Sequence, residues 1–180
     1  MKSVTVFCAS SDRIPEIYKQ HAHEVGKLLA EAGYGLVYGG GGLGTMGIVA
    51  DEMLAAGVHV KGVIPRFMVE VEWQHKGVTD MELTETMSER KQRLIEAGDI
   101  VLVLAGGVGT LDEMFEAISD RKLELNEKSM VVLNTNGLYT PIKDLMSRLD
   151  EENFLRDNDN LYFVDTPQEA LRKIDSILKG

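Results

Sequence analysis

The chain has a single cysteine, Cys8, among its 180 residues. One cysteine excludes an internal disulfide and a cysteine-rich zinc site. Basic residues are also scarce, because 19 lysines and arginines stand against 29 acidic residues, for a net charge of −10. A nucleic-acid surface needs a basic face, so we expect no nucleic-acid partner. A small anionic ligand stays compatible with this charge, since glycine loops and single arginines can bind phosphate locally.

Long apolar runs are absent too. No run approaches the roughly 20 residues of a membrane span, and residues 1–7 are typical of a strand rather than a signal peptide. We therefore expect no membrane association and a cytoplasmic location. A hydrophobic content of 44% and a charged content of 27% are ordinary for a globular protein. The length suits one domain, residues 1–180, with a sizeable core.

Short apolar runs alternate with segments of helical period. The expected strands are residues 4–8, 35–38, 58–64, 100–104, 130–134 and 161–164. The expected helices are residues 15–33, 48–56, 87–97, a segment from the glycine loop at 106 to about 125, residues 138–149, and a helix from Thr166. Residues 66–86 have no clean period and are expected to form a long loop. This alternation predicts an α/β fold, a doubly wound parallel sheet with helices on both faces.

Ligands of such folds bind at the carboxyl ends of the strands, near the switch in strand order. Three loops qualify, residues 8–11, 39–45 and 105–110. The segment 106–113, GGVGTLDE, is the most informative, because it lies between a buried strand and a helix. Glycines at a helix N-terminus leave N–H groups free for an anion, and the helix dipole favours negative charge. A carboxylate in such a cradle, Glu113, should repel the anion unless it has a chemical role.

The loop at 39–47 is a second glycine-rich candidate. Its residues 42–47, GLGTMG, match the dinucleotide pattern G-x-G-x-x-G, but the acidic residue expected about 20 positions on is missing, and the next carboxylate is Glu70. The P-loop pattern also fails, because no Gly-Lys-Ser/Thr follows. Two glycine loops that each open a helix suit a mononucleotide, with phosphate on one or both N-termini. Gly40, Gly41 and Gly44 are the binding candidates in this loop.

The residues YGGG at 38–41, GGVGTLDE at 106–113 and the upstream pair Arg90-Lys91 resemble the LOG ("Lonely guy") family. The resemblance covers residues 7 to about 139. Members are cytokinin riboside 5′-monophosphate phosphoribohydrolases, often labelled lysine decarboxylases. The resemblance implies a Rossmann-like fold, a homodimer, and hydrolysis of a nucleoside 5′-monophosphate, such as AMP or a cytokinin riboside 5′-monophosphate. The products are free base and ribose 5-phosphate, and no cofactor is implied.

The resemblance also implies the roles of individual residues. N-glycosidic cleavage passes through an oxocarbenium-like sugar, which a carboxylate can stabilise or supply with an activated water. Glu113 takes this role by resemblance, with Arg90 as its catalytic partner. The substrate-binding candidates, besides the three glycines above, are Gly106, Gly107, Gly109, Thr110, Lys91, Ser10, Ser11, Glu72 and Ser119.

Two departures from the family pattern matter. Ala105 stands where the family usually has Pro, and Ser119-Asp120 replaces a Thr-Trp pair. Ser119 keeps the hydroxyl. Loss of the Trp changes a wall of the substrate pocket or a subunit contact.

Glu113 also has a structural interpretation. Residues 110–113, TLDE, have the Ser/Thr-x-x-Glu spacing of a capping box, and residues 166–169, TPQE, repeat that spacing without any glycine cradle. We interpret the second as a plain helix cap. A Glu113 side chain folded back onto the Thr110 N–H could not freely reach a sugar.

Other candidates have plain alternatives as well. Arg90 and Lys91 point about 100° apart on a helix, so we do not expect both to contact the same ligand atom. Together with Arg93 they could instead form a solvated basic face. Ser10 and Ser11 fit an ordinary turn, and Glu72 a surface loop. We expect no metal site, because His21 and His23 do not share a helix face.

Two other functions compete with hydrolysis. A non-catalytic nucleotide-binding or sensing module would use the same cradle without turnover. A lysine decarboxylase is disfavoured, because no lysine stands out as a Schiff-base residue and the glycine loops favour phosphate.

Overall fold

The computed structural model describes residues 1–69, 71, 73–155 and 160–180. Its centre is a seven-stranded sheet in which all paired neighbours run parallel, in the order β4-β3-β2-β1-β5-β6-β7. The strands are β1 (Ser3–Phe7), β2 (Gly35–Tyr38), β3 (Val60–Pro65), β4 (Asp80–Thr84), β5 (Ile100–Val103), β6 (Met130–Leu133) and β7 (Leu161–Val164).

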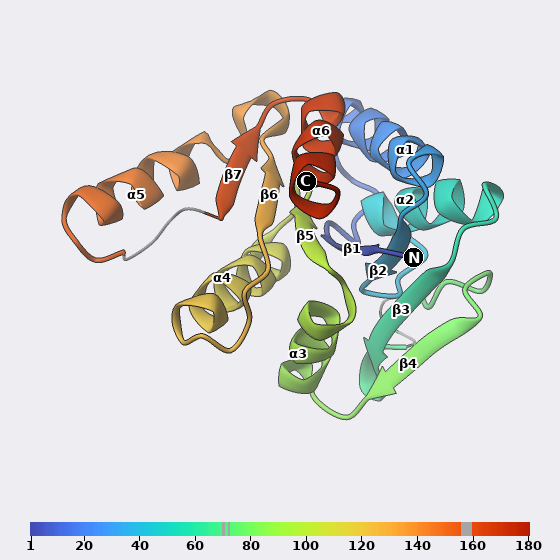
Figure 1. Cartoon of the computed structure of the whole chain (residues 1–180). Coiled ribbons are helices and arrows are strands. Elements are labelled where there is room, and N and C mark those ends of the chain that lie inside the picture. The colour runs from blue at the N-terminus through green and yellow to red at the C-terminus, as the bar shows by residue number, and fades with distance from the viewer. Residues whose placement is uncertain (70, 72, 156–159) are drawn as a thin grey trace.

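Helices cover both faces of this sheet. They are α1 (Glu16–Glu31), α2 (Gly44–Ala55), α3 (Met87–Ala97), α4 (Val108–Lys122), α5 (Thr140–Glu151) and α6 (Pro167–Leu178), with short 3-10 turns η1 (Arg66–Met68) and η2 (Thr135–Gly137). One core cluster joins α1, α2 and α6 to the sheet, and the other joins α3, α4 and α5 (Figure 1). The predicted doubly wound α/β fold is therefore confirmed.

Alternate residues of one strand enter the two cores. In β5, Leu102 lies in the α1/α2/α6 cluster, whereas Val101 and Val103 lie in the α3/α4/α5 cluster. A central parallel strand is buried on both faces, which is why it appears as an unbroken apolar run in the sequence. Each such side chain contributes roughly 1.5–3 kcal/mol by leaving water.

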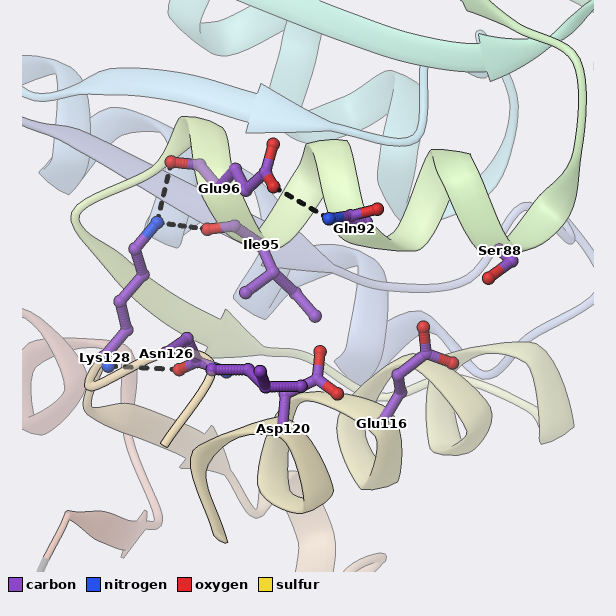
Figure 2. A pocket seen from close by; sticks show the side chains of 9 residues that line it. Ser88, Gln92, Ile95, Glu96, Glu116, Asp120, Asn126 and Lys128 are labelled. Atoms are coloured by element: carbon purple, nitrogen blue, oxygen red, sulfur yellow. Dashed lines mark hydrogen bonds between the residues drawn. The ribbon is translucent and has the colours of Figure 1, made fainter. Parts of the chain in front are cut away.

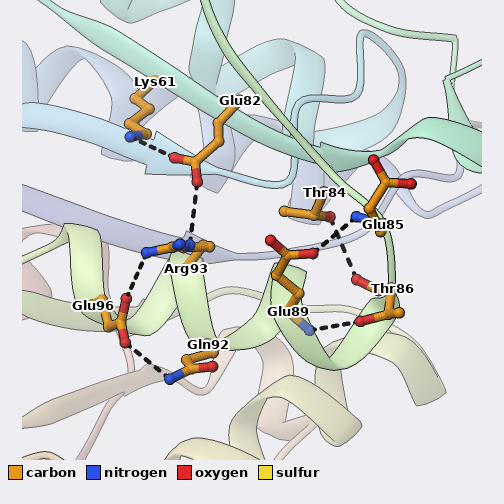
Figure 3. Close-up of polar contacts among 9 residues, drawn as sticks. All are labelled: Lys61, Glu82, Thr84, Glu85, Thr86, Glu89, Gln92, Arg93 and Glu96. Carbon is orange, nitrogen blue, oxygen red and sulfur yellow. Dashed lines mark hydrogen bonds and ion pairs between the residues drawn. The ribbon is translucent and has the colours of Figure 1, made fainter.

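The expectation of a loop over residues 66–86 was wrong, because this segment contains η1 and the edge strand β4. The strand pairs with β3 but buries little apolar surface, and Leu83 is exposed. Glu82 of β4 instead pairs with Lys61 of β3 at 2.7 Å and with Arg93 of α3 at 3.4 Å (Figure 3). Ion-paired side chains thus stand on this edge strand where a central strand has apolar ones. The sequence of β4 therefore shows no hydrophobic period.

The strand order switches at β1. The chain passes outward from β1 through β2 and β3 to β4, then returns to pair β5 on the other side of β1. Between β1 and β5 the connections diverge to opposite faces, which leaves a crevice at their carboxyl ends. The segments that follow these two strands begin at Cys8 and Leu104.

Candidate active site

A cleft of about 270 Å³ opens at this crevice. Three elements supply most of its wall: the turn after β1, the start of α3, and the first turns of α4. Its lining residues are Cys8, Ala9, Ser10, Ser11, Met46, Met68, Met87, Arg90, Gly107, Gly109, Thr110, Asp112 and Glu113. Both predicted catalytic residues, Glu113 and Arg90, therefore meet in one cleft with much of the predicted glycine cradle.

The start of α4 decides between the two interpretations of Glu113. The N-cap of α4 is Gly107, which has no side chain to cap the helix, and Thr110 lies one turn inside. The Thr110 hydroxyl donates to the carbonyl oxygen of Cys8 at 3.1 Å. The capping-box interpretation is thus wrong for residues 110–113, and Glu113 lies in the cleft wall, 5% exposed.

The second Thr-x-x-Glu segment does form a capping box. The Thr166 hydroxyl accepts a hydrogen bond from the N–H of Glu169, and the Glu169 carboxylate accepts one from the N–H of Thr166 at 3.1 Å. The backbone contacts lower the pKa of Glu169, as expected for a carboxylate that accepts N–H groups. Identical spacing thus gives a cap at α6 and a cleft residue at α4.

Residues 107–109 are exposed at the start of α4. A Cβ at Gly107 or Gly109 would have no neighbour within 4 Å, so the space over both residues is open. An uncapped helix N-terminus with open space over its glycines is suited to an anion. The start of α4 therefore has the geometry that the predicted phosphate cradle requires.

Gly106 has a different role from its neighbours. A Cβ there would lie 2.0 Å from the Thr110 hydroxyl oxygen. Its N–H donates to the Tyr139 hydroxyl at 3.1 Å, and that hydroxyl donates to the Leu104 carbonyl at 2.9 Å. Tyr139, whose pKa is raised mainly by burial, thus fixes the turn between β5 and α4. Sequence reasoning missed this residue, since nothing near Tyr139 in the chain indicates a contact with residue 106.

Alanine substitutions should separate these two kinds of glycine. We expect Gly106→Ala to lower the free energy of unfolding by about 1–3 kcal/mol, because the methyl group collides with Thr110. We expect Gly109→Ala to preserve or raise stability, since alanine favours the helix by up to about 1 kcal/mol, but to weaken phosphate binding by filling the cradle. Urea unfolding and AMP binding check the pair. Equal stability loss in both variants would contradict the assignment.

Arg90 is buried, with 2% exposure, at the start of α3. Its Nε donates to the Val63 carbonyl at 3.0 Å, and its Nη2 donates to the Gly39 carbonyl at 2.8 Å. Gly39 is needed for this approach, because a Cβ there would lie 2.4 Å from Nη2. The guanidinium is thereby fixed at the carboxyl ends of β2 and β3 with its plane predetermined.

The α3 helix that carries Arg90 begins at a true cap. Thr86 is the N-cap, and its hydroxyl accepts from the N–H of Glu89 at 3.1 Å (Figure 3). The Glu89 carboxylate accepts from the N–H of Glu85 at 2.9 Å. The cap fixes where the first turn starts, and so which face of α3 carries Arg90 into the cleft.

The other glycine loop is largely occupied by the chain itself. The N–H of Gly44, at the start of α2, donates to the Asp12 carboxylate at 2.7 Å. The Gly40 carbonyl accepts from the N–H of His75 at 3.0 Å, and Gly41 forms a bridge with Gln74. Because the Asp12 carboxylate already lies at the N-terminus of α2, the N-terminus of α4 is better suited to an anion. Substrate binding by Gly40, Gly41 and Gly44 stays a prediction.

The remaining candidates lie in varied places. Ser10 and Ser11 line the cleft. Ser119 is exposed on α4, about 9 Å from Glu113 along the axis at 1.5 Å per residue. Lys91 is not among the cleft-lining residues and pairs with two carboxylates of α4. Glu72 lies outside the described residues.

A second, wider cleft of about 530 Å³ lies between α3 and α4 (Figure 2). Ser88, Gln92 and Glu96 enter it from α3, and Glu116 and Asp120 from α4. Burial and the nearby Glu116 raise the pKa of Asp120. At the far end the Lys128 ammonium donates to the carbonyls of Ile95 and Glu96, the latter at 2.7 Å, and so closes the C-terminus of α3.

Among the residues that the structure describes, no helix is long and apolar enough to span a bilayer. In the same residues, no three His, Cys, Asp or Glu side chains are grouped as metal ligands.

The fold is that of a Rossmann-like α/β protein with a cleft at the strand-order switch. The family described as "Possible lysine decarboxylase" matches residues 46–174. Curated relatives carry a different name, cytokinin riboside 5′-monophosphate phosphoribohydrolase. One from Rhodococcoides fascians is 37% identical over 86% of this chain and 78% of its own length. A "probable" one from Oryza sativa subsp. japonica is 34% identical over 97% of this chain and 72% of its own. The chain belongs to the LOG family.

Solved structures of the same fold include proteins with another described role. A molybdenum cofactor carrier protein from Chlamydomonas reinhardtii matches with a TM-score of 0.79 and 20% identity over 100% of both chains. A molybdenum cofactor binding protein from Rippkaea orientalis matches with a TM-score of 0.77 and 21% identity, over 99% of this chain and 98% of its own. These similarities concern the fold.

Proposed function

We propose that the protein hydrolyses the N-glycosidic bond of a nucleoside 5′-monophosphate, releasing the base and ribose 5-phosphate. One observation carries the proposal: the uncapped N-terminus of α4 opens into the cleft that Glu113 and Arg90 also line. An anion site beside a buried carboxylate suits a substrate with a phosphate at one end and a developing cation at the other.

The α4 cradle would hold the 5′-phosphate through N–H groups at Gly107 and Gly109. Glu113, about 6 Å beyond Gly109 along the helix axis, would then face the ribose. As the bond from C1′ to the base breaks, its electron pair leaves with the base nitrogen. Glu113 stabilises the oxocarbenium-like sugar and accepts a proton from the attacking water, whose oxygen bonds to C1′. The departing base takes up a proton from solvent, and Glu113 later returns its proton to solvent, so the products are neutral base and ribose 5-phosphate.

Arg90 would act on the leaving base. Its guanidinium donates to the carbonyls of Val63 and Gly39, which fixes the guanidinium plane in the cleft wall. From there its positive charge can stabilise the negative charge that develops on the base nitrogen. Preorganised groups of this kind stabilise a transition state without moving during the reaction.

The names of the curated relatives support the reaction class, because those proteins are phosphoribohydrolases of cytokinin riboside 5′-monophosphates. The test is base release across AMP, other nucleoside monophosphates and isopentenyl-adenosine monophosphate. We expect turnover of AMP or of its isopentenyl derivative, with the ratio of their kcat/KM values giving the base preference. Tight binding of these nucleotides without base release over hours would favour a sensing module.

The proposal includes a homodimer in the cytoplasm, as expected from the family resemblance and from the sequence. The two-fold symmetric dimer is the commonest assembly of soluble oligomers, which supports this state. Sedimentation velocity tests the assembly directly. A monomer at micromolar concentration would contradict it.

A further inference from the structure

Three carboxylates crowd the first turns of α4. Asp112, Glu113 and Glu116 lie within five consecutive residues, and Asp112 and Glu113 both line the cleft. Like charges three and four positions apart on a helix repel one another. They would also repel a phosphate at the N-terminus of the same helix. A cation beside these carboxylates, in addition to Arg90 in the cleft wall, would therefore favour an anion in the cradle.

Lys91 of α3 supplies this cation. Its Nζ lies 3.0 Å from Asp112 Oδ2, and it also pairs with Glu116 Oε2. The Lys91 side chain is only 12% exposed, so the ammonium is held between the two helices. Hydrogen bonding to Glu116 raises the pKa of Lys91, which keeps it charged. The single ammonium therefore offsets one of the two negative charges that lie on either side of Glu113 in sequence.

The position of Lys91 is poorly suited to binding the phosphate itself. Arg90 lines the cleft, whereas Lys91, about 100° further around α3, is not among its lining residues. Instead Lys91 lies at the boundary between two clefts: its partner Asp112 lines the cleft of Glu113, and its partner Glu116 lines the α3–α4 cleft. The contacts of its ammonium are with the protein's own carboxylates.

We propose that Lys91 is a positioning residue whose charge offsets part of the negative charge of Asp112 and Glu116, which favours entry of an anionic nucleotide into the cradle, and that it is not a phosphate ligand. This inference rests on the proposed function of the same cleft. It predicts that Lys91 affects nucleotide binding through the two carboxylates, and that its importance disappears when they are neutral. A direct phosphate ligand would stay important whatever its neighbours.

The experiment compares four proteins: wild type, Lys91→Gln, the triple variant K91Q/D112N/E116Q, and Arg93→Gln. Arg93 is the matched control, because it is a cation of the same helix that pairs with Glu82 and Glu96 and is absent from the lining of the Glu113 cleft. AMP affinity is measured by calorimetry, and kcat and KM by adenine release, each at low and at high salt. Thermal melting checks that every variant is folded.

We expect Lys91→Gln to raise both the Kd and the KM for AMP about tenfold at low salt, and less at high salt, because salt screens exposed charges. Its kcat should change by less than about threefold, since the added negative charge does not oppose a cationic transition state. The triple variant, in which all three groups are neutral, should bind AMP within about threefold of wild type or more tightly. Arg93→Gln should stay within about threefold of wild type throughout.

Three outcomes overturn the inference: a triple variant as weak as Lys91→Gln, a Lys91→Gln variant with wild-type affinity, or the same loss in Arg93→Gln. A wild-type protein that binds AMP without releasing adenine contradicts the proposed function alone, because the Kd series still tests Lys91. A wild type that binds no AMP overturns both.

Discussion

Replacing Glu113 by Gln is expected to lower kcat for base release from AMP by about 10²–10⁴-fold, the range typical of a lost acid–base group. The amide keeps the shape of the side chain but cannot accept the proton of the attacking water or stabilise the sugar cation as a charge. Since Glu113 is not part of a helix cap, the substitution removes no cap from α4. Adenine release under saturating AMP, with urea unfolding in parallel, measures the effect.

The chain provides a matched control in Glu169→Gln. Glu169 occupies the same place in a Thr-x-x-Glu segment, but it forms a true capping box at α6. An amide oxygen still accepts the N–H of Thr166, so turnover should not change, and stability should fall only slightly because the carboxylate charge at the helix N-terminus is lost. Unchanged turnover in Glu113→Gln, or an equal loss in both variants, would refute the catalytic role of Glu113.

Replacing Arg90 by Lys is expected to lower kcat by about 10²-fold and the free energy of unfolding by about 1–3 kcal/mol. A single ammonium cannot reproduce the fixed plane that donates to both Val63 and Gly39, and a buried carbonyl left without its donor is costly. Steady-state kinetics and denaturant unfolding separate the two effects.

Gly39→Ala tests the same point without altering the arginine. The new methyl group would lie 2.4 Å from Arg90 Nη2, so the guanidinium must move while its charge is kept. We expect a loss of kcat in the same direction as for Arg90→Lys, and none for Arg93→Lys on the exposed face. An Arg90→Lys enzyme with wild-type kcat would show that the fixed guanidinium plane has no role in the chemistry.

Much of the fold can be predicted from the pattern of apolar residues. The central strands are buried on both faces and therefore appear as unbroken apolar runs, such as residues 100–103. The strand β4 escaped prediction because it is not buried on both faces. It lies at the sheet edge, where Glu82 pairs with Lys61 and Arg93, and ion-paired residues give no hydrophobic period in the sequence. Helix ends were predicted less well than helix cores, since α2 begins at Gly44 rather than at residue 48.

The site was predictable where its chemistry is local. The cradle at Gly107 and Gly109, with Glu113 behind it, is continuous in the chain and needs no tertiary information. Contacts between distant residues were not predictable. The carboxylate of Asp12 on the α2 N-terminus and the hydroxyl of Tyr139 on Gly106 depend on how the loops meet. The ambiguity of Thr-x-x-Glu was of this kind too, because it depended on whether the helix begins at Val108 or at Leu111.

The central claim is that the cleft hydrolyses a nucleoside 5′-monophosphate, and the most direct measurement is a time course of products from AMP, with adenosine as the comparison. The account predicts equal amounts of adenine and ribose 5-phosphate from AMP, and far slower release from adenosine, which has no phosphate for the α4 cradle. AMP that stays intact for hours while bound to the folded protein would contradict it.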